Sequence, residues 1–185
     1  MKPFLAGLIL SLTMAGLATC KPAPLPSPDV LTPADHGQLQ CYNPDRTART
    51  CQSLAGYVRK ADGGIDNSSW VMVSKSPMII MASTTSVAIK NDAVCGSIKA
   101  SDIAAADFTY DGQPLDAAKT AVMRQQVSKN IKGLIGKVIC THYAPTAGGM
   151  TAEATVDGVR QTAMDQPVIW VAPADGYRVG LAPGN

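Results

Sequence analysis

Two short runs rich in β-branched residues, 93–98 and 136–143, each carry one cysteine, Cys95 and Cys140. Runs of this kind are typical of β-strands. If both thiols are oxidised, a Cys95–Cys140 bridge ties two strands together across the segment between them. That segment contains the one long helical pattern of the chain, so we expect the bridge, the strands and the helix to organise the rest of the fold.

The chain has 185 residues, which fits a single domain together with processing segments. Hydrophobic residues make up 46% and charged residues 16%, a composition too apolar for a disordered protein. A nucleic-acid-binding domain needs clustered Lys and Arg, which this chain lacks. We therefore expect a globular domain with no nucleic-acid partner.

Residues 1–20 have the three parts of a secretory signal peptide: Lys2, an apolar run over 4–12, and small residues over 15–19. The tetrad Leu17-Ala-Thr-Cys20 resembles the lipobox of bacterial lipoproteins, although Thr19 stands where that motif prefers Gly, Ala or Ser. The resemblance implies lipidation of Cys20 and a membrane anchor. Ordinary signal cleavage after Ala18 is the alternative.

Residues 21–40 are rich in proline and poor in large apolar residues, so we predict a flexible spacer there and a globular domain over 41–185. The signal, the spacer and the cysteine pattern together resemble those of small exported or lipid-anchored proteins of Gram-negative bacteria. This resemblance implies a cellular location but no particular activity. We expect a periplasmic or outer-membrane location, with secretion as the alternative.

The chain has five cysteines, and an exported protein meets an oxidising compartment in which cysteines pair. Lipidation of Cys20 leaves four, which allow three connectivities. We favour Cys41–Cys51, which closes a short loop around a turn at Asn43-Pro44-Asp45, together with Cys95–Cys140.

The predicted fold class is α+β: a mostly antiparallel sheet with one long and one short helix inserted between two disulfide-linked strands. Turn pairs at Asn91-Asp92 and Asp157-Gly158 favour hairpins and antiparallel pairing. The short helix is expected over 101–107, capped by Ser101, and the long one over 115–134. The strands are expected at 52–59, 70–75, 78–83, 86–90, 93–99, 136–143, 151–156, 159–164 and 168–172.

The sequence offers little catalytic chemistry. His142 is the one histidine predicted to lie in structured chain, and the cysteines lack the short paired spacing of zinc ligands. No nucleophile elbow, phosphate loop or zinc-protease helix occurs. We therefore predict no catalytic, cofactor-binding or metal-binding residues and no cofactor.

The leading hypothesis is a non-enzymatic cell-envelope protein with a binding or structural role, whose partner is an envelope protein or a cell-wall component. One alternative is a small envelope hydrolase that uses His142 and a nearby Asp. The other is an inhibitor or immunity-type module that docks Arg46 and Arg49 of the Cys41–Cys51 loop into an acidic cleft.

Overall fold

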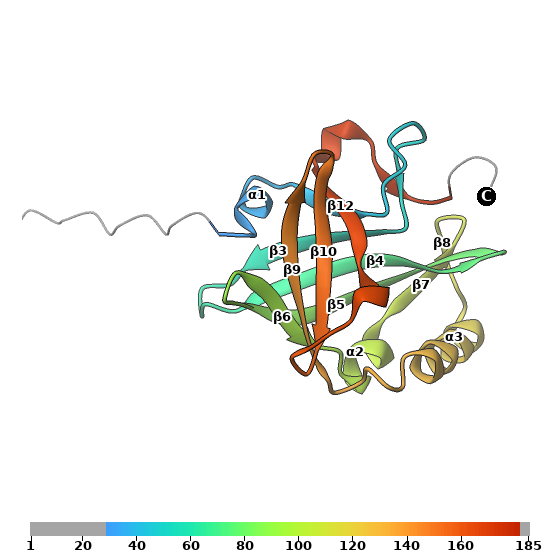
Figure 1. Ribbon diagram of the computed structural model, residues 1–185. Coiled ribbons are helices and arrows are strands. Elements are labelled where there is room, and N and C mark those ends of the chain that lie inside the picture. The colour runs from blue at the N-terminus through green and yellow to red at the C-terminus, as the bar shows by residue number, and fades with distance from the viewer. Residues whose placement is uncertain (1–28, 182–185) are drawn as a thin grey trace, which may run out of the picture.

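The computed structural model describes residues 29–181 as thirteen strands and five short helices (Figure 1). The strands are β1 (Leu39–Tyr42), β2 (Thr50–Cys51), β3 (Ser53–Arg59), β4 (Ile65–Lys75), β5 (Met78–Lys90), β6 (Ala93–Ser97), β7 (Asp107–Tyr110), β8 (Gln113–Pro114), β9 (Val138–Thr146), β10 (Gly149–Val156), β11 (Val159–Arg160), β12 (Gln166–Val171) and β13 (Arg178–Val179). The α-helices are α1 (Thr32–Asp35), α2 (Ala100–Ala105) and α3 (Ala117–Asn130), and the 3₁₀ helices are η1 (Thr162–Met164) and η2 (Pro173–Asp175).

Eight strands form a closed antiparallel barrel in the order β4, β3, β1, β12, β10, β9, β6 and β5, and a β4–β5 pairing completes the circle. Strands β4 and β5 run on beyond the barrel, where β7 and β8 extend the sheet alongside β5. The short β2 and β13 pair in parallel as a separate two-stranded sheet. The central architecture is therefore a closed eight-stranded barrel.

The prediction of an α+β sheet with one long and one short helix inserted is wrong. Closure is the physical reason: β4 pairs with β3 on one side and with β5 on the other, so that the sheet curls onto itself and these strands have no free edge. The strand β4 begins at Ile65, five residues before the predicted start, and β5 unites two predicted strands.

Both predicted helices are shorter than expected. Helix α3 begins after Asp116, whose carboxylate accepts a hydrogen bond from the Lys119 backbone N–H at 2.8 Å, and ends at Asn130. In α2 the Asp102 carboxylate accepts from the Lys99 backbone N–H at 2.8 Å, so Ser101 is not the cap. The two helices pack on the β4–β5 extension and β7 through a separate apolar cluster: Ile103, Ala106, Phe108, Met123 and Val127.

The two predicted hairpin turns are confirmed. Asn91 and Asp92 join β5 to β6 with φ values of 48° and 60°, and Asp157 and Gly158 join β10 to β11 with φ values of 49° and 80°. Positive φ at both central residues is the geometry that Asn, Asp and Gly tolerate best, which explains why these pairs identify hairpins.

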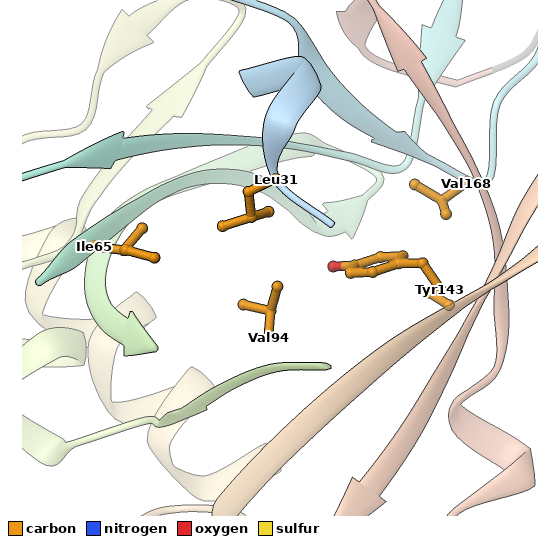
Figure 2. Packing of buried hydrophobic residues seen from close by; sticks show 6 residues of the cluster. Leu31, Ile65, Val94, Tyr143 and Val168 are labelled. Atoms are coloured by element: carbon orange, nitrogen blue, oxygen red, sulfur yellow. The ribbon is translucent and has the colours of Figure 1, made fainter. Parts of the chain in front are cut away.

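The core inside the barrel includes a residue from the predicted spacer. Leu31 is 1% exposed and packs with Ile65, Val94, Tyr143 and Val168, which point toward one another in Figure 2. The folded unit therefore starts before Cys41, the predicted boundary, because α1 and its preceding turn bury an apolar side chain at one end of the barrel. The predicted signal peptide and Cys20 lie outside the described residues.

Candidate functional site

The barrel interior contains an open cavity of about 230 Å³. Along β4 and β5 the inward-facing side chains of Asn67, Ser69, Thr85 and Val87 are only half-buried, so side chains do not fill the interior on that side. An eight-stranded barrel is wide enough to hold either packed side chains or one small ligand. Here the interior has room for a ligand.

The cavity wall is polar but uncharged. Hydroxyl and amide groups of Tyr57, Asn67, Ser69, Thr85 and Thr141 alternate with aliphatic residues of neighbouring strands. Among the described residues that line the cavity, none is Asp, Glu, Lys, Arg or His. A charged group in such a site would be desolvated without a partner, so the wall suits an uncharged ligand.

Gly96 allows strand β6 to lie close to strand β5 in the cavity wall. A Cβ atom at this position would lie 2.9 Å from Val87 Cγ1 and 3.2 Å from the Ser86 carbonyl oxygen. Both distances are shorter than ordinary van der Waals contacts. The glycine therefore permits the β5–β6 pairing without intruding into the cavity.

A cluster of tyrosines lies in the cavity wall and surrounds Gln40, which is 0% exposed. The hydroxyls of Tyr42, Tyr57 and Tyr143 donate to Gln40 Oε1 at 2.8, 2.7 and 3.0 Å. The Tyr42 and Tyr143 hydroxyl oxygens are also 2.7 Å apart. Three strands, β1, β3 and β9, thus direct phenol groups to one point.

Burial raises the pKa of Tyr42 well above its ordinary value, and repulsion from the ionised forms of Tyr57 and Tyr143 adds to this effect. Burial likewise raises the pKa of Tyr57, with a further contribution from Tyr143. These phenols therefore stay protonated through the neutral range and act as hydrogen-bond donors. They do not supply a base at neutral pH.

The cavity continues toward α2. A second compartment of about 200 Å³ shares Asn67, Ser69, Val71, Thr85 and Ile98 with the first. Its outer wall includes Asp102 and Ile103 of α2 and Ile131 at the end of α3, so the second compartment, unlike the first, has one charged residue in its wall. The tyrosine cluster is absent from this second wall, so the phenol groups lie at one end of the combined space.

Both predicted disulfides are confirmed. Cys41–Cys51 joins β1 to β2 with a Cα–Cα distance of 5.4 Å. Cys95–Cys140 joins directly opposed residues of β6 and β9 at 4.0 Å. The second bridge lies on the outer face, since Val94 and Thr141, the cavity-lining residues, are on the alternate positions of these strands.

The structure places Arg46 and Arg49 on the surface, but each donates within the molecule. Arg46 Nη2 donates to the Gly148 carbonyl oxygen, and Arg49 Nη1 donates to the Asp175 carbonyl oxygen at 3.2 Å. The two arginines therefore fasten the Cys41–Cys51 loop to neighbouring loops, a role that needs no acidic partner.

His142 is exposed and lies opposite Ala93 and Glu153 on the outer face of the barrel. The enzyme hypothesis requires this histidine to line a pocket. The next residue, Tyr143, lines the cavity instead, because successive side chains of a strand point to opposite faces.

Sequence reasoning missed Gln40, Tyr42, Tyr57 and Tyr143 as site residues, although one signal was available. Gln40 and Tyr42 flank Cys41 in a strand, so both side chains point away from the disulfide, into the barrel. The convergence of the three tyrosines depends on pairings between distant strands, which the sequence does not show.

Comparison of the chain with protein-family models, curated proteins and solved structures found no match. In residues 29–181 no three His, Cys, Asp or Glu side chains group together as a metal site would require. None of the helices in this part of the chain has the length and apolar character needed to cross a membrane.

Proposed function

We propose that the protein is a non-enzymatic cell-envelope protein that binds a small uncharged ligand inside its barrel. The observation that carries the proposal is the incompletely filled cavity, whose wall has hydrogen-bonding groups and no formal charge among the described residues. Polar groups in an otherwise apolar concave site are the usual means of orienting a small ligand.

The cavity volume supports a ligand built on one ring. An engineered apolar cavity of about 150 Å³ accommodates benzene, so the first compartment, at about 230 Å³, has room for a ring with a short substituent. Access to the second compartment would allow a somewhat longer molecule. A folded partner protein would instead need a broad outer surface.

In the first compartment no described lining residue is an Asp, Glu, His, Lys or Cys that could act as an acid or base near neutral pH, which supports binding over catalysis. In this proposal the protein works outside the cytoplasm, in the periplasm or anchored to a membrane by lipid at Cys20. The two disulfides are compatible with an oxidising, exported location.

Acetophenone and ethylbenzene, neutral molecules with a single ring, are suitable probes for titration by NMR. We expect saturable binding with a Kd between roughly 10 µM and 10 mM, the range open to ligands of this size. Shifted resonances should come from residues that line the cavity, such as Val87 and Val94. Failure of the wild-type protein to bind either probe saturably would reject the proposal.

Thr85→Leu and Thr84→Leu form a matched pair of variants. The Thr85 side chain points into the cavity, whereas the adjacent Thr84 is exposed on the outer face of the same strand. Thr85→Leu is expected to fill part of the cavity and weaken both probes at least about 10-fold, which corresponds to 1.4 kcal/mol. Thr84→Leu should leave binding unchanged, and equal effects of the two substitutions would place the binding site elsewhere.

A further inference from the structure

The tyrosine cluster holds more hydrogen-bond donors than its acceptor can receive well. The Gln40 carbonyl oxygen has two lone pairs, yet three hydroxyls lie 2.7 to 3.0 Å from it. The Gln40 amide nitrogen is fully buried and has no hydrogen-bond partner among residues 29–181. An additional acceptor that received one of the hydroxyls would relieve the crowding at the Gln40 carbonyl oxygen.

Within this cluster the tyrosines, and not Gln40, are the residues that face the cavity. Tyr42, Tyr57 and Tyr143 line the cavity, whereas Gln40 lies behind them. The Tyr143 hydroxyl lies 3.0 Å from Gln40 Oε1, 2.7 Å from the Tyr42 oxygen and 3.4 Å from the Tyr57 oxygen. If one O–H bond turned toward the cavity, the cluster would therefore lose only one hydrogen bond to Gln40 Oε1, an oxygen that already has more donors than lone pairs.

We infer that the ligand carries an uncharged oxygen acceptor, such as a ketone, aldehyde or amide carbonyl, which accepts a hydrogen bond from a hydroxyl of the cluster formed by Tyr42, Tyr57 and Tyr143. This inference rests on the proposed function and specifies the ligand class. A carboxylate or phosphate is disfavoured because no cation among the described residues lines the cavity to balance its charge. The apolar part of the ligand would lie against Val87, Val94 and Ile139.

The test compares acetophenone, which has a carbonyl acceptor, with ethylbenzene, which has a similar shape and no acceptor. Tyr143→Phe removes one hydroxyl and keeps the ring. Loss of a hydrogen bond should weaken acetophenone about 3- to 10-fold and leave the affinity for ethylbenzene unchanged. Since ethylbenzene needs only the folded cavity, its binding shows that the variant is intact.

Two further variants complete the experiment. Tyr57→Phe/Tyr143→Phe should weaken acetophenone more than the single substitution does, because fewer hydroxyls remain to replace the lost donor. Tyr110→Phe is the matched control, since Tyr110 is exposed outside the barrel and does not line this cavity. It should leave the affinities for both probes unchanged.

Each outcome has a separate meaning. A selective loss of acetophenone binding in the cavity variants supports the acceptor inference. If both probes bind the wild type but their affinity ratio stays the same in Tyr143→Phe and in the double variant, the acceptor inference is overturned while the binding proposal stands. If neither probe binds the wild type, the proposed function fails and the inference with it.

Discussion

Replacing Leu31 with alanine tests whether the segment before β1 is part of the barrel core. Leu31 is 1% exposed and contacts the cluster formed by Ile65, Val94, Tyr143 and Val168. Arg59 holds this segment in place through ion pairs to Asp29 at 2.8 Å and Asp35 at 2.9 Å. Truncation of Leu31 therefore leaves a void. The surrounding strands cannot easily move in to fill this void, because the barrel is closed and the ion pairs hold the segment in place.

Buried Leu→Ala substitutions cost about 2–5 kcal/mol, and the constrained barrel favours the upper half of that range, about 3–5 kcal/mol. For a domain of this size each kcal/mol lowers Tm by roughly 2–4 °C, so we expect a fall of about 6–20 °C. Urea unfolding under non-reducing conditions, followed by near-UV circular dichroism, measures the free energy directly. Both disulfides should remain intact throughout.

Val58→Ala is the control, because Val58 is 64% exposed on β3 and its truncation should cost less than about 1 kcal/mol. A loss below about 1 kcal/mol for Leu31→Ala would refute the assignment of Leu31 to the core. The predicted spacer would then be peripheral to the domain, as the proline-rich composition suggests.

Two other predictions concern the tyrosine cluster and the β9–β10 turn. Because the pKa values of Tyr42 and Tyr57 are raised in the folded state, their contribution is fully present below about pH 10, and stability should fall above it by about 1.4 kcal/mol per pH unit for each tyrosine that ionises only on unfolding. Urea unfolding between about pH 9 and 11 should show a smaller loss in Tyr42→Phe/Tyr57→Phe, and an equal loss would contradict this account. At the turn, Gly149→Ala should cost about 1–3 kcal/mol, since the new Cβ would lie 2.7 Å from the Val168 carbonyl oxygen and φ is 147°. Gly148→Ala is the matched control in thermal unfolding, because nothing lies within 4 Å of its Cβ position, and equal Tm values for the two variants would disprove the clash.

Part of the candidate site could not be anticipated from local sequence patterns. Residues 66–68, Asp-Asn-Ser, are typical of a turn in the sequence, yet they belong to the long strand β4. Asn67 and Ser69 point into a cavity, where polar side chains are tolerated. A hollow barrel thus removes the apolar alternation on which the recognition of strands depends.

The sequence by itself determined the features that depend on neighbouring residues or on cysteine chemistry. Asn91-Asp92 and Asp157-Gly158 adopt their turns because their own side chains tolerate positive φ, and the two disulfides join the expected cysteines.

Only the tertiary structure decided that the sheet closes, that Leu31 packs inside it and that three tyrosines from separate strands meet at Gln40. The physical reason is that closure is a property of strand order and register. The same alternating strands fit an open sheet as well as a closed barrel, because the local backbone preferences are identical in both.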